Sequence, residues 1–272
     1  MPRVIVLCAD DYAHTTPISH AILDLAGKRR ISALSCMTAS ALWPTHGAWL
    51  APVRDKVDIG LHLTLVDEAP LTAMPHTAPG GRLPDIATLI KQSYLGRLDL
   101  AEIEAEMRAQ VAAFQRVAAF LPQHIDGHLH THVLPGIRDV VFKIVHEMTP
   151  RPWLRNISDR LPAISSRGIA VPKAAFLALL GRTLSKADAP MNTSFSGVYA
   201  LTTIAGSYGV LFERFIEQMA ARHLILCHPG TGDDTAAHAS ARAAEYNFLA
   251  GDAFAGLLAA RGLRIGRFAE AA

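Results

Sequence analysis

Short apolar runs alternate with longer amphipathic segments along the whole chain. The short runs are typical of buried strands, and apolar residues three or four positions apart are typical of helices that pack on a sheet. The clearest helix is Leu100–Leu121, with apolar positions at Ile103, Met107, Val111, Phe114 and Ala118. Further helices are expected at Ile18–Gly27, Val141–Met148, Val171–Leu184, Phe212–Arg222 and in a region from 236 to 261 interrupted near Gly251. Strands are expected at Val4–Ala9, Ala33–Ala39, Asp58–Leu65, His124–His130, Trp153–Ile157, Asn192–Tyr199, Leu224–Cys227 and Leu263–Phe268.

This alternation predicts an α/β protein with mainly parallel strands. About seven or eight strand–helix units favour a closed or nearly closed, distorted (β/α) barrel, with an open doubly wound sheet as the alternative. No low-complexity linker or fixed-period repeat divides the sequence, so residues 1–272 are expected to form a single domain. Prolines and glycines concentrate in Pro70–Pro84 and predict a loop. The loop from Val66 to Pro84 could form a lid over the substrate, since loops of this length are often functional.

The composition and charge of the chain favour a globular protein that does not bind nucleic acid. Half of the 272 residues are hydrophobic and 18% are charged, which is typical of a globular protein rather than a disordered one. The net charge is +2 and the basic residues are dispersed, so no nucleic-acid-binding surface is predicted. Cys8, Cys36 and Cys227 each lie in an apolar run, and we expect buried, reduced thiols. With no predicted signal peptide or integral membrane span, a cytoplasmic protein is expected.

Acidic and imidazole side chains gather where the predicted strands end. Asp10 and Asp11 follow the first strand, His62 lies near the end of the third, and His228 follows the strand that ends at Cys227. In a parallel α/β barrel the carboxyl ends of the strands share one face, and catalytic residues collect there. Distant segments of the chain are therefore expected to converge.

The densest local pattern runs from His124 to His132. Polar residues recur at every second position, and on a strand they would share one face; they are His124, Asp126, His128, His130 and His132. Imidazole suits zinc and similar ions, and a carboxylate adds tolerance for harder metals. A catalytic metal site needs about three protein ligands and an open position. Not all five residues can be ligands, and spacing alone does not choose among them.

Simpler interpretations remain open for several of these residues. The Asp10–Asp11 pair could cap the following helix, His62 could be a hydrogen-bonded core residue, and His228 could be a turn residue. Arg155 could hold a sugar hydroxyl or a developing oxyanion, or could be a surface cation. The other histidines have no supporting pattern and are mostly expected at the surface: His14, His20, His46, His76, His146, His223 and His238.

Four ordered motifs together resemble those of the YdjC-like carbohydrate deacetylases, in particular the branch of chitooligosaccharide and hopanoid-associated deacetylases. The resemblance extends from Val4 to about Phe268. The motifs are Ala9-Asp10-Asp11-Tyr12, Gly60-Leu61-His62-Leu63, the run His124 to His132, and Cys227-His228-Pro229-Gly230.

The resemblance implies a distorted (β/α) barrel and one divalent metal ion held by Asp11, His62 and His128. It implies Asp10 as general base and His228 as general acid in the removal of an N-acetyl group from a sugar or glycolipid. Zinc or magnesium is the expected ion, with manganese or cobalt as alternatives. A homo-oligomer is compatible with the sequence. The remaining polar residues are expected to contact the substrate or to support the ligands: Asp126, His130, His132 and Arg155.

The chain also departs from the family's pattern. The usual Asn-Ala-Asp-Asp-Phe-Gly reads Cys8-Ala9-Asp10-Asp11-Tyr12-Ala13, and Gly127 stands where serine is common. The ligand positions are retained, so the departures bear on the substrate pocket rather than on the metal. Two rival functions remain: another metal hydrolase, such as a phosphoesterase or cyclic amidohydrolase with two ions, and a non-catalytic sugar-binding protein.

Overall fold

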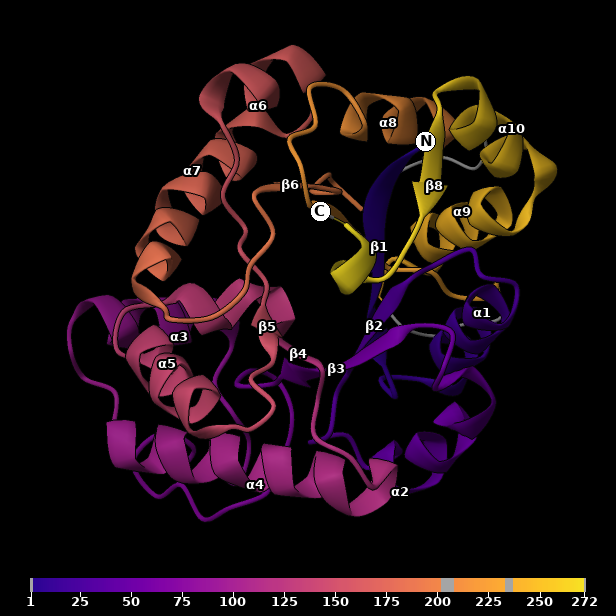
Figure 1. The fold of residues 1–272 in the computed structure, drawn as a ribbon. Coiled ribbons are helices and arrows are strands. Elements are labelled where there is room, and N and C mark those ends of the chain that lie inside the picture. Colours follow the sequence, from indigo (N-terminus) through magenta and orange to yellow (C-terminus); the bar gives the residue numbers. More distant parts are fainter. Residues whose placement is uncertain (1, 202–207, 233–236, 272) are drawn as a thin grey trace.

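Parallel strands form the centre of the molecule and helices surround them (Figure 1). The structure is a computed structural model that describes residues 2–201, 208–232 and 237–271. The strands are β1 (Arg3–Tyr12), β2 (Ala33–Cys36), β3 (Asp58–Leu63), β4 (His124–Gly127), β5 (Trp153–Leu154), β6 (Ser194–Ser196), β7 (His223–Cys227) and β8 (Leu263–Ile265).

The sheet curls into a distorted (β/α) barrel, as the sequence predicts. Its strands follow the order β5-β4-β3-β2-β1-β7-β6, and β8 pairs with the beginning of β1. The two ends of this path approach each other, because Leu154 of β5 forms a parallel bridge with Met191, just before β6. All the pairings are parallel, so the carboxyl ends of the strands lie on the same side of the barrel.

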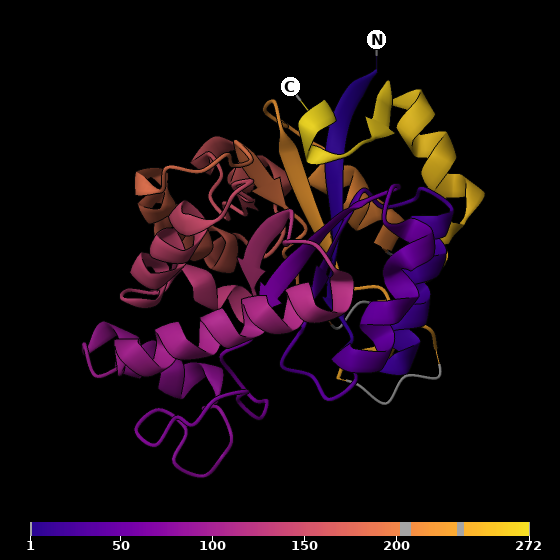
Figure 2. The ribbon, with the colours of Figure 1, turned by 60° about the horizontal axis from the view of Figure 1, so that its bottom comes forward.

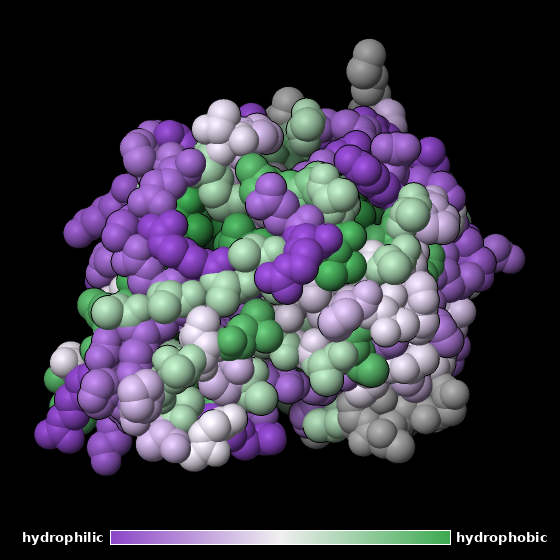
Figure 3. Space-filling model, turned by 90° about the horizontal axis from the view of Figure 1, so that it is seen from below, coloured by the Kyte–Doolittle hydropathy of each residue, from purple (hydrophilic) through white to green (hydrophobic). Residues whose placement is uncertain are grey.

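Helices cover the outside of the barrel. The predicted long helix is α4 (Leu100–Ala118), which lies along the bottom of Figure 1 and buries Ile103, Met107 and Phe114. Figure 2 brings the bottom of that view forward and shows α4 crossing in front of the strands. The face of the molecule seen from below mixes hydrophilic and hydrophobic side chains (Figure 3). No helix among the described residues is both long and apolar enough to cross a membrane. The other α-helices are α1 (Thr16–Gly27), α2 (Trp43–His46), α3 (Ile86–Tyr94), α5 (Ile137–Glu147), α6 (Leu161–Arg167), α7 (Val171–Gly181), α8 (Tyr208–Phe215), α9 (Ala239–Ala250) and α10 (Asp252–Ala260).

Several predicted boundaries differ from the structure. Helices α2, α3 and α6 are absent from the prediction, since they are short or lie in segments rich in proline. The helix expected over Phe212–Arg222 ends at Phe215. The helical region expected from 236 to 261 divides at Gly251 into α9 and α10, although its first residue lies outside the described residues.

Two histidines expected at the surface are in the core instead. His46 is 2% exposed and His223 is 1% exposed. The two ring nitrogens of His223 lie 2.6 Å from Ser194 Oγ and 2.8 Å from Ser196 Oγ. Serine hydroxyls therefore satisfy a buried imidazole that the linear sequence gives no reason to bury. The three cysteines are buried and unpaired, as predicted.

The proline-rich loop between β3 and α3 is confirmed, but it is tied down rather than free. Thr72 donates to Glu106 Oε2 from its backbone nitrogen at 2.9 Å and from its hydroxyl at 2.8 Å. The backbone nitrogens of His76 and Thr77 donate to the carboxylate of Glu102. Both glutamates belong to α4. The helix thus fixes the loop through charge-assisted hydrogen bonds.

Candidate active site

Strand register brings the predicted residues together at the carboxyl end of the barrel. On β1 and β7, Ala9 pairs with Cys227, which places Asp10 level with His228. On β3 and β4, His62 pairs with Asp126. Four strand ends therefore contribute to one cluster, although their residues are as far apart in the sequence as Asp10 and His228. The convergence expected from a parallel barrel is observed.

Asp11, His62 and His128 form a compact set of possible metal ligands. One oxygen or nitrogen atom from each lies within 4.8 Å of the others. Asp11 Oδ1 is 3.0 Å from His128 Nδ1 and 3.4 Å from His62 Nε2. His62 Nδ1 is 2.6 Å from Asp126 Oδ1, so its Nε2 faces the cluster. A carboxylate behind a histidine is a common arrangement in metal sites, because it fixes the ring and its tautomer. These residues fit a divalent ion.

The charges in this cluster perturb one another strongly. Burial raises the pKa of Asp11, but Arg242 and His128 outweigh it and hold this pKa well below its usual range. Burial lowers the pKa of His62, but Asp126, Asp10 and Asp11 outweigh it and raise the value to about 10. An anionic Asp11 is ready to bind a cation. His62 has to release a proton to do so, which couples metal binding to pH.

Arg155 lies behind the site rather than at its surface. It has no exposed area, and its two terminal nitrogens each lie 2.6 Å from an oxygen of Asp10. Its Nη2 also lies 2.5 Å from Asp126 Oδ2. The alternative of a surface cation is therefore wrong, whereas contact of Arg155 with a sugar hydroxyl or a developing oxyanion stays a prediction. The guanidinium holds two carboxylates in place, a geometry that arginine favours.

The histidine-rich run does not continue as a strand. β4 ends at Gly127, and His128–Val133 forms a 3-10 turn in which Leu129 and His130 have left-handed backbone angles (φ 50° and 61°). A side chain at Gly127 would lie 2.8 Å from the backbone nitrogen of His132, so glycine permits this tight turn. The prediction of five polar side chains on one strand face is therefore wrong.

The turn sends these polar side chains in different directions. Asp126 and His132 are buried, and His132 Nε2 lies 3.0 Å from the carbonyl oxygen of Arg155. His124 is buried against Trp153, with ring centroids 4.1 Å apart. His128 and His130 instead line the cavity described below. Of the four residues predicted to contact substrate or support the ligands, only His130 reaches that cavity.

His228 lies close to Asp10 at the carboxyl end of β7. Its Nε2 is 4.0 Å from Asp10 Oδ2, and its side chain retains 22% exposure. Burial lowers the pKa of His228 below its usual value, so the neutral imidazole is favoured at neutral pH. Its backbone nitrogen donates to Glu245 Oε2 at 2.5 Å. A neutral imidazole with a carboxylate nearby can relay a proton that it first receives.

Two residues of α9 complete the site and are absent from the sequence prediction. Arg242 Nη2 lies 2.6 Å from Asp11 Oδ2, and Glu245 binds the backbone of His228. One feature of the sequence could have indicated them: Arg242 and Glu245 fall among the buried positions of α9, such as Ala241 and Leu249. Charged residues on the buried face of a helix require partners.

A cavity of about 550 Å³ opens onto this cluster. Asp10, Asp11, His62 and His228 are among the residues that line it. The other walls are largely apolar and come from the turn after β4, from α3 and α7, and from the segment after β6: Leu129, Ile86, Ile90, Phe176, Leu177, Val198 and Leu201. This volume is within the range of sites for small ligands, and a few polar groups in an apolar cleft are typical of them.

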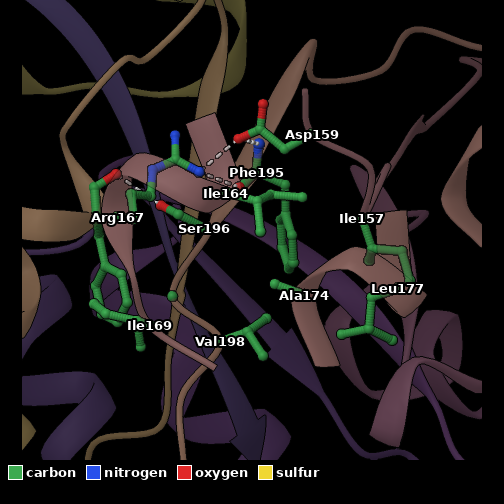
Figure 4. A pocket seen from close by; sticks show the side chains of 12 residues that line it. Ile157, Asp159, Ile164, Arg167, Ile169, Ala174, Leu177, Phe195, Ser196 and Val198 are labelled. Atoms are coloured by element: carbon green, nitrogen blue, oxygen red, sulfur yellow. Dashed lines mark hydrogen bonds and ion pairs between the residues drawn. The ribbon is translucent and has the colours of Figure 1, made fainter. Parts of the chain in front are cut away.

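A smaller cavity of about 30 Å³ lies under α6 and α7 and shares Leu177, Gly197 and Val198 with the large one. Figure 4 shows its side chains, which are mainly apolar. At its edge Arg167 pairs with Asp159 at 2.6 Å and also donates to the carbonyl oxygen of Phe195. The pair neutralises two buried charges beside the cavity, which has room for little more than a water molecule.

The YdjC-like protein family matches residues 4–260, and the chain belongs to this family. One relative is the chitooligosaccharide deacetylase of Yersinia pestis (strain Pestoides F). It is 28% identical over 276 aligned positions, which cover 99% of this chain and all of the relative. The chain thus belongs to the YdjC-like family and is similar over nearly its whole length to a protein named as a deacetylase.

Solved structures share the fold. A protein described as a cellobiose-phosphate cleavage protein, from Enterococcus faecalis V583, is 18% identical, covers 99% of both chains and has a TM-score of 0.72. A family 4 acetyl xylan esterase from Clostridium thermocellum, in complex with a cobalt ion, is 11% identical and has a TM-score of 0.50. That match covers 98% of this chain and 89% of the other. At these identities the likeness concerns the fold of the barrel.

Proposed function

We propose that this protein is a metal-dependent carbohydrate N-deacetylase, which hydrolyses the N-acetyl group of an amino-sugar-containing oligosaccharide or glycolipid. One observation carries the proposal. A carboxylate, Asp10, and an imidazole, His228, flank a set of three metal-ligand side chains at the wall of a cavity. Membership of the YdjC-like family and the deacetylase name of a relative support this chemistry over other hydrolyses.

Asp11, His62 and His128 would hold the ion. When bound, a divalent cation supplies a Lewis acid that polarises the amide carbonyl and makes a water molecule more acidic. The mixed carboxylate and imidazole set suits zinc, and magnesium, manganese and cobalt are alternatives. The ion bound to the family 4 acetyl xylan esterase is cobalt, which supports a divalent cation without fixing its identity.

Asp10 is the proposed general base. Both of its oxygens accept from Arg155, which fixes the plane of the carboxylate, and Asp10 lines the cavity. It would take the proton of the attacking water. His228 would pass a proton to the leaving amine. Because burial favours its neutral form, it has to gain that proton during the reaction. Asp10, whose Oδ2 is 4.0 Å away, could hand on the proton that it takes from the water.

The proposal is tested by acetate release from N-acetylglucosamine oligomers and from N-acetylated glycolipids. Asp10→Asn and His228→Ala are each expected to lower kcat by about 100-fold or more, a typical contribution of a general acid or base. Metal content is measured in parallel, so that loss of the ion is not mistaken for loss of a proton-transfer group. Full activity in both variants would overturn these roles, and no acetate release by the wild-type protein would overturn the reaction.

The rival metal hydrolases are less well supported. A phosphoesterase or cyclic amidohydrolase of the two-metal type needs a second ion a few ångströms from the first. Asp10, His62 and Asp126 do converge and could offer ligands. Arg155, however, is paired with both Asp10 and Asp126, so a cation already occupies that position. A non-catalytic sugar-binding protein would have no need to retain Asp10 and His228 together.

A further inference from the structure

Helix α9 contributes two charged side chains to the active site, although it lies on the outside of the barrel beside α1 (Figure 1). Arg242 and Glu245 are three residues apart, so they project from the same side of the helix. Arg242 is 6% exposed and Glu245 has no exposed area. Burying two charges on a peripheral helix is costly unless each has a specific partner. The partners are the metal-ligand candidate Asp11 and the proposed acid His228.

Arg242 leaves the two carboxylate oxygens of Asp11 with different partners. Its Nη2 lies 2.6 Å from Oδ2, whereas Oδ1 faces His128 Nδ1 at 3.0 Å and His62 Nε2 at 3.4 Å. Asp11 itself has a left-handed backbone (φ 68°), which turns its side chain away from the regular direction of the strand. With Oδ2 held by a guanidinium, only Oδ1 remains for an ion between the two histidines.

Glu245 performs the corresponding task for His228. Its Oε2 accepts the backbone N–H of His228 at 2.5 Å, and its Oε1 accepts the hydroxyl of Tyr199 at 2.5 Å. His228 and Tyr199 both line the cavity, and they come from the ends of β7 and β6. The carboxylate therefore ties two strand ends to one helix. The position of the His228 backbone, from which the imidazole extends, therefore depends on its hydrogen bond to Glu245.

We propose that α9 is the positioning element of the site, with Arg242 selecting the oxygen of Asp11 that binds the ion and Glu245 setting the location of His228. This inference rests on the proposed function, but its two halves have different readouts. Arg242 acts on the metal, and its effect is measurable without substrate. Glu245 acts on proton transfer, and its effect appears in kcat while metal binding stays intact.

The Arg242 half is tested by binding of cobalt(II) alone, followed through its visible absorption spectrum. Arg242→Met removes the guanidinium with little change in volume and frees Oδ2. Binding at least tenfold weaker is expected, as is typical when a partner of a metal ligand is lost, together with a changed spectrum. Arg242→Lys, which retains a cation, should restore part of the affinity. Wild-type affinity and spectrum in Arg242→Met would overturn this half.

The Glu245 half is tested by steady-state kinetics of acetate release. Glu245→Asp keeps the carboxyl group but is too short to reach both His228 and Tyr199, so kcat should fall about tenfold or more with KM and cobalt affinity unchanged. Glu245→Gln preserves the length and an accepting oxygen, and should retain most of the activity. Equal kcat in Glu245→Asp and wild type would overturn this half.

Tyr246→Phe is the matched control, because it removes a hydrogen bond from the next residue of the same helix. Its hydroxyl lies 3.1 Å from Asp24 Oδ2 on α1, away from the site. Cobalt affinity and kcat should both match wild type; a loss equal to those of Arg242→Met and Glu245→Asp would show a general effect of helix docking and overturn the inference. A wild-type protein that binds cobalt but releases no acetate would contradict the proposed reaction. The effect of Arg242→Met on cobalt binding would still test the Arg242 half.

Discussion

At the scale of single residues, the site is a network of buried charges. Arg155 has no exposed area and contacts Asp10 and Asp126, while Asp126 in turn orients His62. Such a network contributes little to net stability when complete, because desolvation of the charges offsets their attraction. Removing one member leaves the others buried without a partner. The same residues therefore affect both folding and catalysis.

Replacing Arg155 by methionine is expected to destabilise the protein by about 3–5 kcal/mol, as is typical when one partner of a buried ion pair is removed. It should also lower kcat, because Asp10 loses the group that fixes its carboxylate. Urea denaturation and acetate release measure the two effects. Arg151→Met is the control, since Arg151 pairs with an exposed Asp188 and its loss should cost 1 kcal/mol at most, as an order of magnitude. Equal stability of the two variants would contradict this account.

His223 predicts a dependence of stability on pH that is independent of the active site. Burial and the nearby charge of Arg167 lower the pKa of His223 to about 3, below the value of about 6.5 in an unfolded chain. Between these values the unfolded state binds a proton that the folded state does not. Stability is therefore complete above about pH 6.5 and falls as the pH drops toward 3, on the order of 1 kcal/mol per pH unit.

The measurement is the free energy of unfolding in urea at several pH values from 7.5 to 5. His223→Gln should be less stable than wild type at pH 7.5, because Ser194 and Ser196 lose the imidazole, and should show a shallower decline toward pH 5. His20→Gln makes the same chemical change at an exposed position of α1 and should leave the slope unchanged. Equal slopes in His223→Gln and wild type would show that this histidine does not titrate on unfolding.

At the scale of elements, the strands were more predictable than the turns. Apolar runs identify β1, β3 and β7 because burial on both faces of a parallel strand requires them. The alternation in His124 to His132 suggests a strand equally well, yet the chain turns after Gly127 because His132 packs against it. The left-handed angles of Leu129 and His130 depend on contacts that are remote in sequence. Local pattern cannot reveal such a turn.

Local pattern also could not reveal most of the residues that hold the candidate ligands and proton-transfer groups in place. Asp10, Asp11, His62 and His228 could be found because each follows or lies in an apolar strand. Arg155 was found, although the alternative of a surface cation was wrong, and Arg242 and Glu245 were missed. Their roles depend on where α9 packs, which tertiary contacts decide.

The loop between β3 and α3 gives a prediction at this scale. Glu106 has no exposed area and binds Thr72, while Asp67 of the same loop lines the cavity. Glu106→Ala should loosen the loop and raise KM severalfold, with a smaller effect on kcat because the proton-transfer groups are untouched. Glu104→Ala is the control: it removes ion pairs of the same helix with Arg108 and with Lys143 of α5, none of which involves the loop. A raised KM in the control, or none in Glu106→Ala, would contradict the role of this tie.

At the scale of the whole molecule, the barrel brings one cluster of acids and imidazoles to the ends of its strands and encloses it in a cavity. The class of fold could be predicted from the alternation of strands and helices, and the family from four motifs. The central claim is that Asp11, His62 and His128 bind one divalent ion. Each of the three lines the cavity, so an ion there would face the substrate.

The most direct test of that claim is metal content per chain, measured by elemental analysis after dialysis against zinc, cobalt or magnesium. The wild-type protein should hold one ion, His62→Ala and Asp11→Ala should hold none, and Asp10→Asn and His228→Ala should each still hold one. Two ions in the wild type, or an ion retained in both His62→Ala and Asp11→Ala, would contradict the account.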